Sequence, residues 1–81
     1  MRDKIRGVLT AHARLPVDVA TLEDDSDLYQ AGMTSHASVS VMLALEDAFD
    51  LEFPDSMLKR NVFETVNSIA AALAEVAGSA R

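Results

Sequence analysis

Apolar side chains recur along the chain at helical intervals. Ile5, Val8 and Leu9 are spaced to form one buried face of an amphipathic helix, and His12 continues their stripe. No segment shows the alternation of apolar and polar residues that is typical of a strand. We therefore expect an all-α fold, a small four-helix bundle with a short third helix and a long loop between the first two helices. The segments expected to be helical are residues 2–14, 35–49, 55–60 and 65–77.

Residues suited to helix ends stand at the borders of these segments. Thr34 with Ser35, then Asp55 and Thr65, lie at the starts of the last three helices. Their side-chain oxygens can accept hydrogen bonds from the free backbone N–H groups of a first turn. Pro16 is expected to stop the first helix and Gly78 to terminate the last.

Residues 15–34 form a loop that is long for so small a domain, and such loops are usually functional or disordered. Asp27 can cap a single turn at residues 28–31, which Gly32 can end with a positive φ angle. Because apolar side chains occur along the whole loop, we expect it to be pinned to the core. These side chains belong to Leu15, Val17, Val19, Leu22 and Leu28.

The second predicted helix has two apolar stripes instead of one. The first, expected to face the core, consists of Val41, Met42, Leu45 and Phe49. The second consists of His36, Val39 and Leu43. A surface helix needs only one buried stripe, so the second indicates an exposed contact face.

Length and charge narrow the classes of function. The 81 residues suffice for one domain, taken as residues 1–81, and the net charge of −6 argues against a nucleic-acid partner. Residues 15–58 contain ten acidic side chains and no lysine or arginine. This stretch is either a solvated acidic surface or a source of negative potential that steers basic partners toward the protein. The absence of cysteine and the presence of only two histidines argue against a metal site. With no apolar run long enough for a membrane span and no signal peptide, a cytoplasmic protein is expected. Since no sequence feature indicates stable oligomerisation, we also expect a monomer.

None of the polar residues forms a recognisable active site. Ser35 and His36 are consecutive helix residues, which do not face each other, and the same holds for Glu46 and Asp47. His12 lies in an apolar stripe and is interpreted as a histidine at the edge of the core. We therefore expect no catalytic residue and no enzymatic activity of the chain itself.

Ser35 is set apart by its position. It follows the turn ended by Gly32 and opens a helix, so its hydroxyl is expected at the positive end of the helix dipole. Free backbone N–H groups would stabilise a phosphate ester there. The local pattern leaves two interpretations open: a helix cap worth about 1 kcal/mol, or a site of phosphate attachment.

A wider pattern resembles the acyl and peptidyl carrier proteins. It covers nearly the whole chain, at the spacing and chain length typical of that family. The resemblance implies a bundle of the acyl-carrier-protein type in which a phosphopantetheinyl transferase attaches 4′-phosphopantetheine to Ser35. The arm would supply the thiol that a chain without cysteine lacks. The residues that carry the resemblance are Asp27-Leu28-x-x-x-Gly32-Met33-x-Ser35-x-x-x-Val39-x-Val41-x-x-x-Leu45-Glu46-x-x-Phe49, then Phe53-Pro54-Asp55 and Thr65-Val66.

The neighbours of the serine narrow the resemblance. Thr34 and His36 stand where the family usually has Asp and Leu, and Ser40 replaces a common Glu. The run Gly-Met-Thr-Ser-His at residues 32–36 looks most like the bacterial aminoacyl carrier proteins. That subgroup is charged with an amino acid such as glycine or alanine by a seryl-tRNA-synthetase-like amino acid:[carrier protein] ligase, which uses ATP.

The resemblance thus implies a carrier that is loaded by such a ligase and unloaded by an unidentified acceptor enzyme, with no nucleic-acid or membrane partner. Two alternatives remain: an acyl or peptidyl carrier of fatty-acid, polyketide or nonribosomal peptide synthesis, or an interaction bundle that has lost its prosthetic group. The weakly acidic second helix argues against a fatty-acid partner set, and the intact Ser35 argues against the interaction bundle. The residues expected to contact partners are Thr34, His36, Val39, Leu43, Met57, Lys59 and Arg60.

Overall fold

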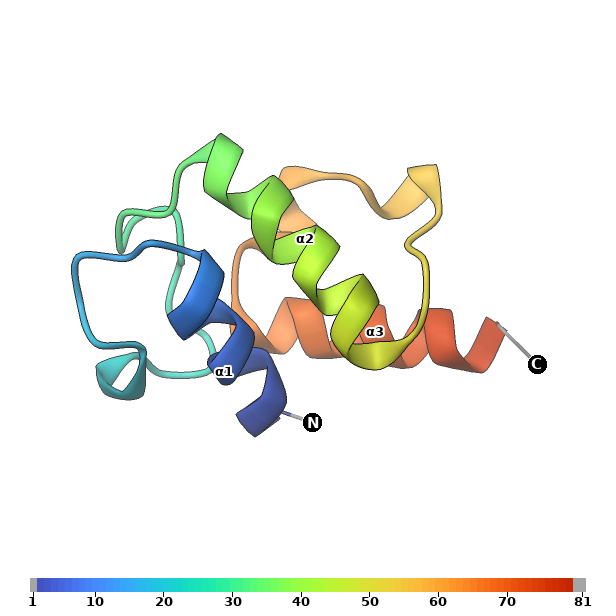
Figure 1. The fold of residues 1–81 in the computed structure, drawn as a ribbon, viewed down its shortest axis with the longest axis horizontal. Coiled ribbons are helices and arrows are strands. Elements are labelled where there is room, and N and C mark those ends of the chain that lie inside the picture. The colour runs from blue at the N-terminus through green and yellow to red at the C-terminus, as the bar shows by residue number, and fades with distance from the viewer. Residues whose placement is uncertain (1, 80–81) are drawn as a thin grey trace.

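The computed structural model describes residues 2–79. Figure 1 shows its three α-helices: α1 (Arg2–His12), α2 (Ser35–Phe49) and α3 (Val66–Ser79). Three 3-10 turns lie between them: η1 (Val19–Thr21), η2 (Asp55–Met57) and η3 (Arg60–Phe63). Among the described residues there is no strand, and none of the helices is both long and apolar enough to cross a membrane. The all-α class is confirmed, whereas the count of four helices is not.

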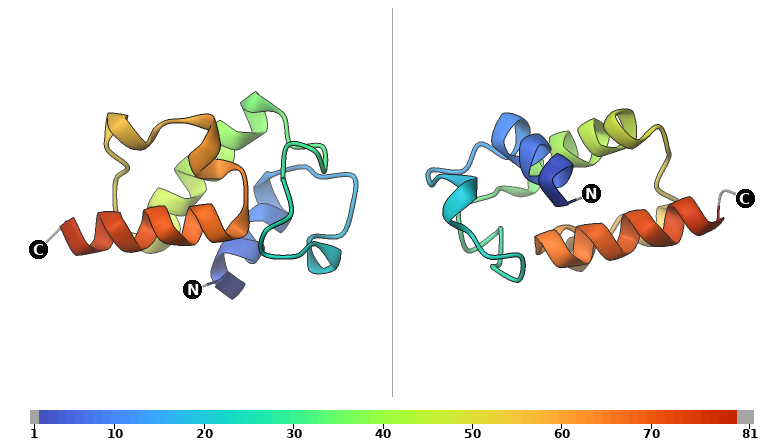
Figure 2. Two further views of the ribbon diagram at one scale, coloured as in Figure 1. Left: turned by 180° about the vertical axis from the view of Figure 1, so that it is seen from behind. Right: turned by 90° about the horizontal axis from the view of Figure 1, so that it is seen from below.

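The core lies between the three α-helices. The right-hand view of Figure 2 shows α3 on one side and α1 with α2 on the other. Val41 and Leu45, from the predicted core stripe of α2, are fully buried, while Met42 and Phe49 are half-buried at its margins. Aliphatic side chains fill most of this space, as expected for a chain with few aromatic residues. The largest fully buried side chains are those of Ile5, Leu9, Leu28, Val41, Leu45, Val66, Ile69 and Leu73.

The observed helix ends follow the predictions in part. α2 covers the predicted residues, and the Thr65 hydroxyl caps α3 by accepting the N–H of Ser68 at 2.9 Å. α1 ends at His12, because Arg14 adopts a left-handed conformation (φ 54°) and turns the chain before Pro16 is reached. α3 runs through residue 78, so the expected glycine terminator was wrong.

Two separate turns replace the short helix expected at residues 55–60. Lys59 is extended (φ −125°, ψ 151°) and divides η2 from η3. Pro54 rather than Asp55 occupies the cap position of η2, and no side-chain cap hydrogen bond forms there. A segment this short makes too few helical hydrogen bonds to offset the cost of nucleating a helix, so tertiary packing decides its conformation.

The loop at residues 15–34 is pinned to the helices by polar as well as apolar contacts. The Arg6 guanidinium donates to the carbonyl of Val19 at 2.8 Å and to the Asp24 carboxylate at 2.7 Å. The backbone N–H of Leu28 donates to the carbonyl of Glu64 at 2.7 Å, which ties the loop to the start of α3. Of the apolar side chains expected to anchor the loop, Val19 and Leu28 are buried, Leu15 and Leu22 are half-buried, and Val17, contrary to expectation, is 44% exposed.

Candidate functional site

A well-defined turn leads the chain to Ser35. The Asp27 carboxylate accepts hydrogen bonds from the N–H groups of Tyr29 at 2.9 Å and of the next residue at 3.2 Å, which confirms the predicted cap. Gly32 follows with a backbone φ angle of 121°, which residues other than glycine rarely adopt. Met33 is buried and fixes the chain to the core two residues before the serine. The position of Ser35 is therefore set by contacts on its N-terminal side.

Thr34, not Ser35, caps α2. Thr34 is extended (φ −82°, ψ 163°), and its hydroxyl oxygen accepts the N–H of Ala37 at 3.0 Å. Ser35 is exposed as the first residue of the helix, and its hydroxyl makes no hydrogen bond to any residue between 2 and 79. Its carbonyl accepts the hydroxyl of Ser38 at 2.7 Å. The capping role is thus taken by the neighbour, and the Ser35 hydroxyl is left free to be esterified.

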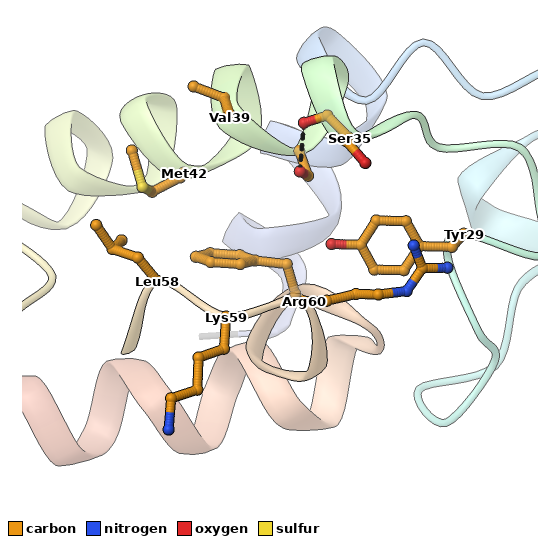
Figure 3. A pocket seen from close by; sticks show the side chains of 9 residues that line it. Tyr29, Ser35, Val39, Met42, Leu58, Lys59 and Arg60 are labelled. Carbon is orange, nitrogen blue, oxygen red and sulfur yellow. Dashed lines mark hydrogen bonds between the residues drawn. The ribbon is translucent and has the colours of Figure 1, made fainter. Parts of the chain in front are cut away.

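A pocket of about 270 Å³ opens beside Ser35 (Figure 3). α2 provides one wall and the segment at residues 58–63 provides the other. The side chains of Met42 and Leu58 give its far end an apolar lining, while Ser35 lies at the end occupied by Tyr29 and Arg60. The lining residues are Tyr29, Ser35, Ser38, Val39, Met42, Leu58, Lys59, Arg60 and Phe63.

The two cations that line this pocket differ in placement. The Arg60 guanidinium lies over the Tyr29 ring, 4.0 Å from its centroid, in a cation–π contact. The Lys59 side chain points away from α2 (Figure 3). Arg60 is exposed, and its contact with Tyr29 holds the guanidinium at the end of the pocket nearest Ser35 (Figure 3).

The structure divides the predicted contact residues among several surfaces. Val39, Lys59 and Arg60 share the pocket of Ser35. Thr34 and His36 line a second hollow together with Arg14, Leu43 lines a third between α1 and α2, and Met57 lies in a groove against α3. The stripe of His36, Val39 and Leu43 is exposed, as expected, with Val39 51% and Leu43 55% accessible. On the surface of α2 these three residues are neighbours, because they are spaced three and four positions apart.

The remaining polar candidates have other surroundings. The Glu46 carboxylate accepts the backbone N–H of Phe53 at 2.8 Å, which braces the chain after α2, while Asp47 is exposed. His12, the last residue of α1, is exposed rather than at the edge of the core. Within residues 2–79 no group of three or more histidine, aspartate and glutamate side chains gathers in a way that could hold a metal ion.

Five of the nine pocket residues were not predicted as site residues. Met42 was assigned to the core, and Tyr29, Ser38, Leu58 and Phe63 were assigned no role in the site. An aromatic residue two positions after the Asp27 cap was a usable signal for Tyr29, because the Asp27 carboxylate accepts its backbone N–H and so fixes its place in the turn. Leu58 offered none, since its place in the pocket depends on how residues 54–63 fold back over α2.

Comparison with known proteins identifies what this arrangement is similar to. The family model described as the phosphopantetheine attachment site matches residues 5–73. An aminoacyl carrier protein of Agrobacterium fabrum is 46% identical over 69 residues, 85% of this chain and 83% of that protein.

Solved structures agree with the family match. The first is the crystal structure of an engineered Bradyrhizobium japonicum glycine:[carrier protein] ligase complexed with carrier protein from Agrobacterium tumefaciens and AMP. The match has a TM-score of 0.90 and 43% sequence identity, and it covers 91% of this chain and 99% of that one. The corresponding complex with ATP gives a TM-score of 0.90, 41% identity, and coverage of 93% and 97%. A solution structure of an Agrobacterium tumefaciens protein gives a TM-score of 0.79 and 40% sequence identity. This match covers 98% of the present chain and 95% of that one.

Proposed function

The chain belongs to the phosphopantetheine attachment-site family of carrier proteins, and we propose from this that it carries an amino acid on a 4′-phosphopantetheine arm attached to Ser35. The arm, when bound, supplies a thiol that can hold the amino acid as a thioester, since the chain itself has no cysteine. Residues 1–81 act as a single carrier domain in this proposal. The relative named an aminoacyl carrier protein and the carrier-protein complexes with a glycine ligase support an amino acid as the cargo.

One observation supports Ser35 as the attachment point. Its hydroxyl is exposed at the start of α2 and has no hydrogen-bond partner among residues 2–79, because Thr34 makes the cap. A phosphodiester formed there meets free backbone N–H groups and the positive end of the helix dipole. Ser38, one turn further on, is half-buried, and its hydroxyl is engaged with a carbonyl. The surroundings of Ser35 therefore fit the group, and those of the next serine do not.

The protein supplies the attachment point and the contact surface in this reaction, while its partners supply the chemistry. A phosphopantetheinyl transferase attaches the arm, an amino acid:[carrier protein] ligase loads it, and an acceptor enzyme takes the cargo. His36, Val39 and Leu43, all exposed on α2, are proposed to contact these enzymes, together with Thr34, Met57, Lys59 and Arg60. A carrier must leave each partner again, so these contacts are expected to be weak and to affect encounter rates more than folding.

The attachment is tested by producing the protein together with a broad-specificity phosphopantetheinyl transferase and measuring its intact mass. We expect a gain of one phosphopantetheine in the wild type and in Ser38→Ala, and no gain in Ser35→Ala. An unmodified wild type would leave only the interaction-bundle interpretation. Equal modification of Ser35→Ala would move the attachment to another residue.

The cargo is tested separately on the modified protein. Incubation with ATP, a glycine:[carrier protein] ligase and single amino acids is expected to add one glycyl or alanyl group, which neutral hydroxylamine removes because it cleaves thioesters. The unmodified protein serves as the control. If no amino acid is added while the arm is present, the cargo assignment is wrong and an acyl or peptidyl carrier is the better description.

A further inference from the structure

Of the six lysine and arginine side chains within residues 2–79, only two contact a carboxylate. Arg2 and Arg6 both contact the carboxylate of Asp24, at 3.5 and 2.7 Å. Arg60 and Arg14, in the hollows on either side of the start of α2, have no carboxylate within 4.0 Å among residues 2–79. Neither hollow has an aspartate or glutamate in its lining. In a chain with 13 acidic residues, the positive charge around Ser35 is therefore left available for another anion.

Arg60 is the best placed of these cations. It shares the pocket with Ser35, and the Tyr29 ring beneath its guanidinium restricts its rotation. A planar guanidinium can donate two parallel N–H groups to a phosphate, and stacking on an aromatic ring leaves those edges free. Lys59 points away from α2, and Arg14 lies in the other hollow.

We propose that Arg60, held by Tyr29, binds the phosphodiester that joins the prosthetic arm to Ser35. This inference rests on the proposed attachment at Ser35. The phosphate then accepts hydrogen bonds from two sides, from the backbone N–H groups in the first turn of α2 and from the guanidinium across the pocket. Arg60 is thus a positioning residue, which fixes the base of the arm on the side of α2 that faces residues 58–63.

Nuclear magnetic resonance of the apo and modified proteins tests this directly. Modification is expected to shift the Arg60 Nε–Hε signal and to slow its exchange with solvent by about two- to fivefold, the range expected for one exposed ion pair. The ³¹P signal of the modified wild type is expected to differ from that of modified Arg60→Gln. Arg14→Gln is the matched control, since it removes the same charge from the other hollow and should leave the ³¹P signal in place.

The tyrosine gives a second test of the same geometry. Tyr29→Phe keeps the ring beneath the guanidinium and is expected to keep the wild-type ³¹P signal, whereas Tyr29→Leu is expected to move it toward that of Arg60→Gln. A structural role for Tyr29 alone would not change the phosphorus signal in parallel with Arg60→Gln. The spectrum of each variant's backbone amides establishes that it is folded.

Two outcomes overturn the inference, and both differ from failure of the proposed function. If the intact mass shows the arm in every variant but the ³¹P signal is the same with and without Arg60, the guanidinium does not bind the phosphate. If Arg14→Gln shifts that signal as much as Arg60→Gln, the effect is one of overall charge and not of this contact. Absence of the arm from the wild type would instead refute the attachment itself.

Discussion

Replacing Gly32 with alanine tests how the start of α2 is positioned. Gly32 has φ 121°, and an added Cβ would lie 2.7 Å from Cδ of Pro16 and 3.1 Å from its Cγ. The proline ring closes on the backbone, so it cannot rotate away as the tip of a flexible side chain can. Backbone strain on the order of 1–3 kcal/mol adds to a steric cost of similar size. We expect the free energy of unfolding to fall by about 2–6 kcal/mol, with slower modification of Ser35.

Urea unfolding followed by circular dichroism measures this effect, and a second glycine provides the matched control. Gly7 lies inside α1, and a Cβ there would meet nothing within 4 Å. Because glycine weakens a helix interior, Gly7→Ala is expected to raise the free energy of unfolding by about 0.5–1 kcal/mol. The two glycine-to-alanine substitutions should therefore change the free energy of unfolding in opposite directions. A Gly32→Ala protein within about 0.5 kcal/mol of the wild type would refute the argument from φ and from contact with Pro16.

Three further substitutions address packing and capping, each measured by urea unfolding. Leu45→Ala, at a side chain with no exposure, is expected to cost about 2–5 kcal/mol; a loss under 1 kcal/mol would show that α2 buries another face. Leu43→Ala is expected to stay within about 0.5 kcal/mol of the wild type and to slow loading by the ligase, since this side chain is 55% exposed; an unfolded variant would mean that the two stripes are assigned backwards. Thr34→Ala removes the cap bond to Ala37 and is expected to cost about 1 kcal/mol; an unchanged stability would argue that Ser35 can cap in its place.

Prediction succeeded where the signals are local and reinforce one another. α2 was predicted to the residue because two capping hydroxyls at Thr34 and Ser35, the apolar spacing of Val41 and Leu45, and the end at Phe49 all indicate the same helix. The Asp27 cap and the positive φ of Gly32 were likewise predictable, since each depends on a few adjacent residues. Prediction failed at residues 55–60, where the segment is too short for its own propensity to outweigh packing.

The sequence by itself determined the helical class, the turn before Ser35, the family resemblance and the position of that serine. Only the tertiary structure decided that Thr34 takes the cap and leaves the Ser35 hydroxyl free. It also placed Val39 beside the pocket of Ser35, and it placed Arg60 on Tyr29, 31 positions earlier in the chain. Local hydrogen bonding acts over a few residues, so it can be inferred from spacing. A pocket is formed by segments that the burial of a common core brings together, and no local pattern specifies which side chains then face each other.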